Sequence, residues 1–299
     1  MKRSVMSFLV ELHLRLTEKH YSDKKLQRDI ESRRKNGDIP YSLPRKIAKK
    51  YSFSEKQYKG MQVFSINEEE KSDRVVLYLH GGAYYRKPRD YHFSFMGEIS
   101  ENTKIPFVAP IYGKAPNHTP MEAYEILSSL YFQLQEKYNE VIFMGDSSGG
   151  GLAIGLALYL KEMGHKLPSS IVLLCPWMDV SLTNENIKDY IKKEPIVFFD
   201  NAQVLGRLWA GNLPIDDYRV SPIYGDMRGL SETHIFCGTR EVLYPDCVLA
   251  YERLKESGVD AYLYIGEGQN HVYPIYPLIK EAKIARRQIE NIIKKDSTN

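Results

Sequence analysis

The stretch VIFMGDSSGGGLAIGLALYL, residues 141–160, contains a short apolar run, a turn of glycines and serines, and a longer segment of small and apolar residues. The run at 141–145 is typical of a buried strand. The segment after the turn is long enough for a helix, and its small residues favour close packing of that helix on a sheet. A strand that turns sharply into a helix is a unit of α/β folds, so this stretch indicates the fold class.

Two adjacent serines, Ser147 and Ser148, lie in this turn. Ser147 has glycine two places before it and two places after it, whereas Ser148 has Asp146 at the earlier place. In a nucleophile elbow both places are glycine, because a Cβ there collides across the strained turn. A flexible loop also fits the bare pattern, but the flanking strand and helix favour the elbow. We therefore expect Ser147 to be a nucleophile.

Apolar runs and helical stretches alternate on both sides of the turn. The runs are continuous, as in parallel strands covered on both faces. They span residues 74–80, 105–110, 141–145, 170–175, 234–238 and 261–266. Helices are expected over about 121–137, 148–163, 246–257 and 277–295. This order predicts an α/β protein with a mostly parallel, doubly wound sheet.

Two further segments are expected to form a helical cap. Residues 1–55 contain N-terminal helices, and an insertion at about 180–230 separates two strands by more than one crossover helix requires. The apolar residues at helical spacing near the N-terminus are Val5, Phe8, Leu9, Leu12 and Leu16. Sites in such sheets lie beyond the carboxyl ends of the strands, so the cap would cover the site. The core is then residues 56–299, interrupted by the insertion.

The run at 74–80 ends in His80-Gly81-Gly82-Ala83. Glycines let backbone N–H groups approach a substrate oxygen closely. We expect the N–H groups of Gly81 and Gly82, with that of Ser148 at a helix N-terminus, to form an oxyanion hole. His80 is expected to brace this turn by hydrogen bonding.

A serine nucleophile also needs a base and an acid that orients the base. After an elbow of this kind the acid and then the histidine follow in chain order, and His271 is the histidine that follows the last expected strand. Three carboxylates are candidates for the acid. Glu241 lies nearest to a strand end and is preferred, while Asp246 and Asp179 stay open.

The composition limits the classes of partner. With 41 basic and 38 acidic residues the net charge is +3, which argues against nucleic acid as the main partner. The three cysteines show no metal-type spacing and are expected to be free thiols in the cytoplasm. Charged residues interrupt the apolar N-terminus, which is too short to span a bilayer, so no stable membrane insertion is expected. The oligomeric state stays open, with a homodimer as one alternative.

Together these residues resemble the hormone-sensitive lipase family of α/β-hydrolases, in its bacterial esterase branch. The resemblance runs in order from about residue 74 to 285. Its segments are HGGAYY (80–85), PIYGKAPNHTPMEAY (110–124), GDSSGG (145–150), CPWMDVSLTNENI (175–187), SPIYGDMRGL (221–230) and GQNHVY (268–273). The resemblance implies an α/β-hydrolase fold with a helical cap.

The chain departs from the family pattern in three places. Ala83 replaces a third glycine, but its backbone N–H remains, so the oxyanion hole is expected to survive. Gly113 and Asn117 replace an arginine and a glutamate that are usually paired. Glu241 begins a segment where the family has Asp-Pro-Leu, and this is why Asp246 is kept as an alternative acid.

The expected activity is that of a serine carboxylesterase, which hydrolyses short-chain acyl esters through an acyl-enzyme. We expect no cofactor and no metal, because neither H-E-x-x-H nor Cys-x-x-Cys occurs. Tyr84, Tyr85, Phe198 and Trp209 are candidates for substrate binding, although aromatic residues more often pack in a core. An amide or formamide hydrolase and a non-catalytic ligand receptor are the alternatives.

Overall fold

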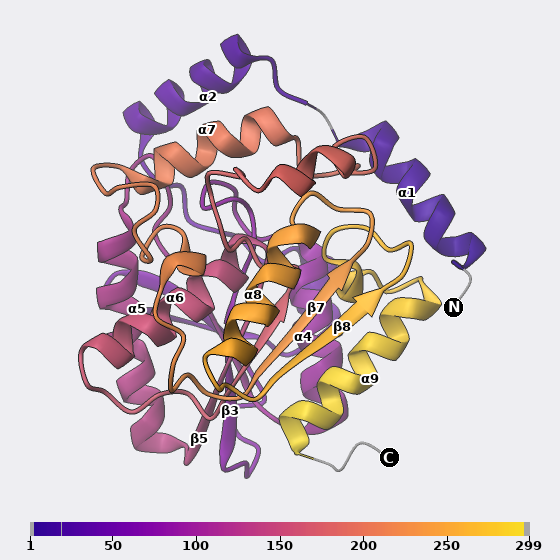
Figure 1. The fold of residues 1–299 in the computed structure, drawn as a ribbon. Coiled ribbons are helices and arrows are strands. Elements are labelled where there is room, and N and C mark those ends of the chain that lie inside the picture. The colour runs from indigo at the N-terminus through magenta and orange to yellow at the C-terminus, as the bar shows by residue number, and fades with distance from the viewer. Residues whose placement is uncertain (1–2, 19, 296–299) are drawn as a thin grey trace.

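The structure is a computed structural model that describes residues 3–18 and 20–295. Across these residues one sheet holds eight strands in the order β1-β2-β4-β3-β5-β6-β7-β8 (Figure 1). The strands are β1 (Ser54–Tyr58), β2 (Met61–Ile66), β3 (Arg74–Leu79), β4 (Phe107–Pro110), β5 (Glu140–Asp146), β6 (Ser170–Leu174), β7 (Thr233–Gly238) and β8 (Ala261–Gly266). Neighbours from β4 to β8 are parallel, and β2 pairs antiparallel with β1 and β4. The predicted mostly parallel sheet is confirmed.

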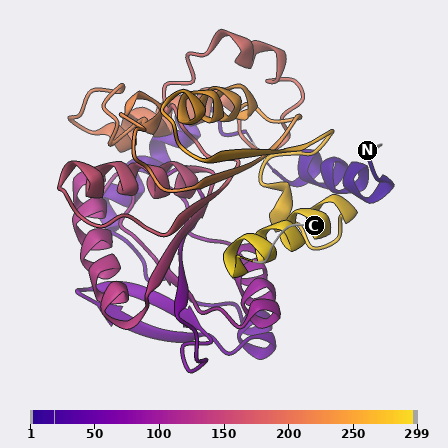
Figure 2. The same cartoon turned by 60° about the horizontal axis from the view of Figure 1, so that its bottom comes forward.

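Helices cover both faces of the sheet (Figure 2). Helices α5, α6 and α8 pack on one face, and α3, α4 and α9 pack on the other. The α-helices of the described residues are α1 (Val5–Thr17), α2 (Asp23–Asn36), α3 (Arg45–Lys50), α4 (Asp90–Thr103), α5 (Pro120–Lys137), α6 (Ser148–Glu162), α7 (Phe199–Ala210), α8 (Tyr244–Glu256) and α9 (Lys280–Lys294). Short 3-10 helices are η1 (Glu185–Asp189), η2 (Pro222–Tyr224) and η3 (Tyr273–Ile275).

Strand β3 shows why its apolar run is continuous. Val75 and Leu77 point into the core under α5 and α6, whereas Val76 and Tyr78 point into the core under α4 and α9. All four side chains are completely buried. A central strand with two covered faces has no position at which a polar residue would reach water.

The edges of the sheet differ from this pattern. β8 is an edge strand, and Tyr262 and Ile265 on it are exposed, so the expectation that every run is covered on both faces is wrong there. At the other edge, the β1–β2 hairpin was not predicted. The residues of β1 are polar and mostly exposed, because the strand has a neighbour on one side only.

The cap segments lie beyond the carboxyl ends of β7 and β8, where Figure 1 shows α1, α2 and α7. Leu26 and Ile30 of α2 pack with Leu205 of α7. By contrast, Ile47 of α3 packs in the core on the α4 side. The domain boundary at residue 55 therefore stays a prediction, since part of the N-terminal segment packs with the core.

Helix α1 turns its apolar side outward. The exposed fractions are 77% for Val5, 58% for Phe8, 48% for Leu9, 46% for Leu12 and 73% for Leu16. The helical spacing predicted for these residues is present, but they do not form a buried face. Among the described helices none is long and apolar enough to cross a membrane.

The buried side of α1 is mixed, since Leu14 is buried there beside the polar residues Ser7 and Glu11. Glu11 accepts hydrogen bonds from Arg240 at 2.8 and 2.9 Å, and also pairs with Arg3 and Arg15. The Ser7 hydroxyl donates to Gln269 Oε1 at 2.8 Å. Because Arg240 follows β7 and Gln269 follows β8, α1 is attached to the two loops at the carboxyl ends of these strands.

Candidate active site

Ser147 lies between β5 and α6 in a tight turn. Its φ of +53° is in the left-handed region, which a serine adopts only when the surrounding structure holds it there. A Cβ added to Gly145 would lie 2.3 Å from the Gly149 carbonyl oxygen, and a Cβ added to Gly149 would lie 2.0 Å from the Leu79 carbonyl oxygen. Both separations are far below van der Waals contact, so the backbone requires glycine at the two places that the sequence argument used.

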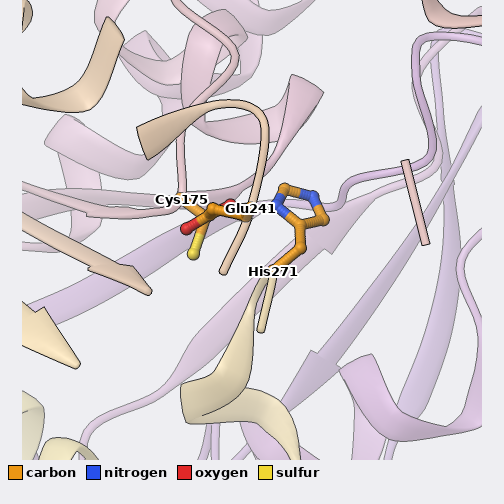
Figure 3. A group of neighbouring side chains, drawn as sticks. All are labelled: Cys175, Glu241 and His271. Atoms are coloured by element: carbon orange, nitrogen blue, oxygen red, sulfur yellow. Dashed lines mark hydrogen bonds and ion pairs between the residues drawn. The ribbon is translucent and has the colours of Figure 1, made fainter. Parts of the chain in front are cut away.

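The structure brings together Ser147, His271 and Glu241. His271 Nε2 lies 3.0 Å from Ser147 Oγ, and His271 Nδ1 donates a hydrogen bond to Glu241 Oε2. Figure 3 shows the Glu241 carboxylate pointing toward the His271 ring. Since Nδ1 carries the proton that the carboxylate accepts, Nε2 of the neutral ring is free to accept a proton from the serine.

The other two candidate acids do not contact His271. Asp246 lies in α8 and accepts a hydrogen bond from Asn184 at 2.8 Å. Asp179 accepts hydrogen bonds from Ser181 and Thr183 in its own loop. Glu241 is completely buried, and its Oε1 accepts from the backbone N–H of Gly238 at 2.8 Å. Of the three carboxylates, Glu241 is therefore the one placed to orient the histidine.

Burial by itself lowers the pKa of His271, but the carboxylates outweigh it and the net pKa is raised above the ordinary value. Glu241 is the main cause of the rise, and Glu194 adds to it. A raised pKa means that the protonated ring, the imidazolium, is stabilised. The His271 ring is therefore a stronger base for the proton that it would accept.

Glu194 is a buried carboxylate that the sequence argument missed. Its oxygens accept from the backbone N–H groups of Ile196 at 2.7 Å and Val242 at 3.2 Å. Burial raises the pKa of Glu194 to about 7. Because Val242 follows Glu241, this carboxylate ties the cap to the loop that carries the acid. No local pattern marks Glu194, which has a lysine on one side and a proline on the other.

The expected oxyanion hole needs one correction. The Gly81 N–H donates to Asp146 Oδ1 at 2.9 Å, so it is not free to bind a substrate oxygen, and the prediction for Gly81 is wrong. Within residues 3–18 and 20–295, the N–H groups of Gly82, Ala83 and Ser148 have no acceptor. Ser148 also accepts a hydrogen bond from the Tyr84 N–H through its Oγ at 3.2 Å.

Asp146 is completely buried and links the elbow to its surroundings. Besides the Gly81 N–H, it accepts from the Tyr78 hydroxyl at 2.6 Å and lies 3.3 Å from His92 Nε2. Burial alone would raise the pKa of Asp146, but His92 and these donors lower it below the ordinary value. His80 Nδ1 lies 2.7 Å from the Gly81 carbonyl oxygen, as expected for a bracing residue. The loop after β3 is thus held against the elbow by a network that the sequence did not reveal.

A cavity of about 100 Å³ contains Ser147 and His271 in its lining. Apolar residues from the cap form one wall, namely Ile196, Val197, Phe198, Ala202 and Leu205. Polar residues in the lining include Glu18, Arg86 and Arg89, and Glu18 pairs with Arg89 at 2.6 Å.

Of the four aromatic candidates for substrate binding, Phe198 lines this cavity and the other three do not. Tyr84 is buried and stacks on Trp209 with ring centroids 4.5 Å apart. The Tyr85 hydroxyl donates to Asp29, and its ring packs with α2 and α7. These three rings pack between the cap and the core, and their role in substrate binding stays a prediction.

Cys175 lies next to the acid (Figure 3). One ligand atom from each of Cys175, Glu241 and His271 lies within 4.8 Å of the others, a spacing that could hold a metal ion. However, His271 Nδ1 already donates to Glu241, and the Val272 N–H donates to Cys175 Sγ at 3.1 Å. Burial and then Glu241 raise the pKa of the thiol, so it is neutral and a poor metal ligand. We therefore interpret the contact between Glu241 and His271 as one that orients the histidine ring, and not as part of a metal site.

A strand–elbow–helix turn, a buried carboxylate and a histidine after the last strand of a mostly parallel sheet define a hydrolase of the α/β class. A family model described as alpha/beta hydrolase fold matches residues 76–275, so the chain belongs to this family. This confirms the fold predicted from the sequence.

Proteins named as an esterase and a lipase are similar to this chain over much of its length. An esterase of Acinetobacter venetianus is 27% identical over 217 residues, which span 71% of this chain and 72% of the relative. A triacylglycerol lipase of Mycobacterium tuberculosis is 30% identical over 64% of this chain, but the match spans only 40% of that lipase.

Solved structures agree with this assignment. The crystal structure of a candidate esterase from Staphylococcus aureus superposes with a TM-score of 0.86 at 27% identity, covering 96% of this chain and 97% of that one. An esterase from the bacterial hormone-sensitive lipase family superposes with a TM-score of 0.82 over the whole of both chains, at 24% identity, which speaks for the fold. The matching family model confirms the resemblance to α/β-hydrolases.

Proposed function

We propose that the protein is a serine carboxylesterase in which Ser147 is the nucleophile, His271 the base and Glu241 the acid that orients the base. One observation carries this proposal: Ser147 Oγ lies 3.0 Å from His271 Nε2, and the other ring nitrogen donates to a buried carboxylate. This is the arrangement that nucleophilic catalysis by a serine requires. The esterases and lipases among the relatives support the same class of reaction.

In the first half of the reaction, His271 Nε2 accepts the Ser147 proton while Oγ attacks the ester carbonyl carbon. The negative charge that forms on the carbonyl oxygen is stabilised by the N–H groups of Gly82, Ala83 and Ser148, which lack acceptors in the described structure. His271 then gives its proton to the leaving alcohol oxygen, and the acyl group stays on Ser147. Glu241 keeps the ring oriented and stabilises the imidazolium.

In the second half, a water molecule attacks the acyl-enzyme and gives a proton to His271 Nε2. Collapse of the tetrahedral intermediate releases the carboxylic acid, and the proton returns from His271 to Ser147 Oγ. No group beyond the three side chains, the N–H donors and water takes part in this sequence.

We propose that the substrate is a small-molecule ester with a short acyl chain. The cavity at Ser147 measures about 100 Å³, far below the ~300–1,000 Å³ of sites that enclose drug-sized ligands. Its apolar wall at Ile196, Phe198 and Leu205 suits an aliphatic group. An amide or formamide could use the same triad, and leaving-group chemistry separates these alternatives experimentally.

The test is a panel of p-nitrophenyl esters of increasing acyl length, with an aryl amide and a formamide alongside. We expect the highest kcat/KM with short acyl groups, loss of turnover in Ser147→Ala, and fluorophosphonate labelling on Ser147. Ser148→Ala is the matched control, because it keeps its backbone N–H and should retain most of the activity. Turnover that persists in Ser147→Ala would overturn the mechanism. Faster hydrolysis of the dodecanoate than of the butyrate would overturn the short-chain preference, and binding without turnover would indicate a receptor.

A further inference from the structure

A second and larger cleft borders the loop that follows β3. Its volume is about 860 Å³, within the range of ~300–1,000 Å³ typical of small-molecule sites. The lining comes from α2 and the loop after it, the β1–β2 hairpin, the segment after β4 and the start of α5. Lys87 lines both this cleft and the cavity at Ser147, so the two spaces share a wall. The proposed reaction makes no use of the larger cleft.

The Lys114 side chain lies in the lining of this cleft and is only 5% exposed. Its Nζ donates to the Tyr112 carbonyl oxygen at 2.7 Å, and this is its only hydrogen-bond acceptor in the part of the chain that the structure describes. An ammonium group has three N–H donors, so two of them are left for a ligand. Burial is the main cause that lowers the pKa of Lys114 to about 8, so the amine is still mainly charged at neutral pH.

Two further cations lie close to Lys114. Lys87 and Arg33 both lower the pKa of Lys114, and Arg33 lowers that of Lys87 after burial has done so. Lys87 Nζ donates to the Pro40 carbonyl oxygen at 3.1 Å, so it too has a neutral acceptor. The positive charges of the three side chains repel one another, and an anion bound among them would reduce this repulsion.

Each carboxylate in the lining has a partner, and one of these partners is Arg33. Asp29 pairs with Arg33 at 3.4 Å and accepts the Tyr85 hydroxyl. Asp38 and Glu122 flank His118, at 3.4 and 3.1 Å from its ring nitrogens. Asp38 also attracts Lys114 and Lys87 and so opposes the repulsion between them, as Asp29 partly neutralises Arg33. Among the described residues, Lys114 and Lys87 donate to backbone carbonyl oxygens and neither forms an ion pair with a carboxylate.

We propose that this cleft is a second binding site, which takes a small molecule with a phosphate or carboxylate group seated on Lys114, Lys87 and Arg33. Such charge-assisted hydrogen bonds are about twice as strong as those between neutral groups. The remaining lining can take an apolar body, since it includes Ile39, Pro40, Met61, Ile111 and Ile126. Gly113 also borders the cleft and contributes no side chain to fill it.

The test is a titration of the full chain at a pH near 7 with inorganic phosphate and, separately, with acetate, at an ionic strength held constant with sodium chloride. Heat of binding and melting temperature are both recorded. We expect saturable binding in the millimolar range for at least one anion, and the two arms distinguish a phosphate group from a carboxylate. Lys114→Met should weaken this binding by at least about tenfold, because a hydrogen bond to a charged group contributes ~1.5–3 kcal/mol.

The matched control is Lys283→Met, an exposed lysine on α9 outside the cleft, which should bind as the parent does. Circular dichroism checks that Lys114→Met folds. If it does not fold, Lys87→Gln takes its place and should also weaken binding. Absence of saturable binding to the parent, or binding to the folded lysine variants that equals that of the parent, would overturn the proposal.

Discussion

Replacement of Glu241 by glutamine should leave the fold intact and remove most of the activity. Both carboxylate oxygens accept N–H donors, one from His271 and the other from Gly238. A glutamine amide has one oxygen, so its NH2 group must face one of these two donors. If it faces His271, the ring is favoured in the tautomer with the proton on Nε2, which can no longer accept the proton of Ser147.

The expected loss in kcat is on the order of 10³–10⁴, or about 4–5.5 kcal/mol of transition-state stabilisation. The assay is hydrolysis of a short p-nitrophenyl ester, with circular dichroism and thermal melting to confirm folding. Asp246→Asn and Asp179→Asn serve as controls, since neither carboxylate contacts His271. If Glu241→Gln stays within about tenfold of the parent while one control loses its activity, the assignment of the acid is refuted.

Three further predictions concern the base, its neighbour and the elbow. The raised pKa of His271 should place the acid limb of the kcat/KM profile above about 6.5, with activity rising as the pH rises and the ring loses its proton; a midpoint below that value would contradict the prediction. Glu194→Gln should move that limb modestly to lower pH, because Glu194 raises the pKa of His271 only to the extent that it is ionised, and its own pKa is about 7; an unchanged midpoint in a folded variant would show that Glu194 has no such effect. Gly149→Ala should destabilise the fold by about 3 kcal/mol or more, because its Cβ would lie 2.0 Å from a backbone oxygen. Urea denaturation beside the exposed control Lys283→Ala on α9 would measure this; equal midpoints would mean that the turn can open.

The parts of the fold that the sequence predicted are those whose residues are constrained by immediate neighbours. The runs that became β3 to β7 are apolar throughout because both faces are covered, and the elbow requires glycine around Ser147 for steric reasons within a few residues. The position of His271 followed from chain order once the serine was assigned. β1 could not be predicted in the same way, because an exposed, polar edge strand lacks the apolar run that marks a buried one.

The site residues that the sequence misplaced depend on contacts between distant segments. The sequence alone does not distinguish Gly81 from Gly82. In the structure Asp146 accepts a hydrogen bond from the Gly81 N–H, whereas the Gly82 N–H has no acceptor among the described residues. Tyr84 follows the oxyanion turn closely in sequence, yet its ring stacks on Trp209 rather than lining the cavity. Glu194 reaches the acid loop from the cap, across nearly fifty residues of chain. These partners decide the direction in which an N–H or a ring points. A short sequence pattern cannot predict them, because they lie far away along the chain.

The polar attachment of α1 makes the edge of the site responsive to the solution. Glu11 holds α1 to Arg240, next to Glu241, through ion pairs, and because the Glu11 side chain is largely buried, salt screens these pairs less than it screens exposed ones. Burial raises the pKa of Glu11, but its three arginine partners outweigh burial and lower the pKa to about 2. The ion pairs are therefore fully formed at a pH above the ordinary pKa of a glutamate, and they are lost as the pH falls toward 2. Mild acid therefore leaves the ion pairs of Glu11 intact, and the first helix stays attached through them to the loop after β7.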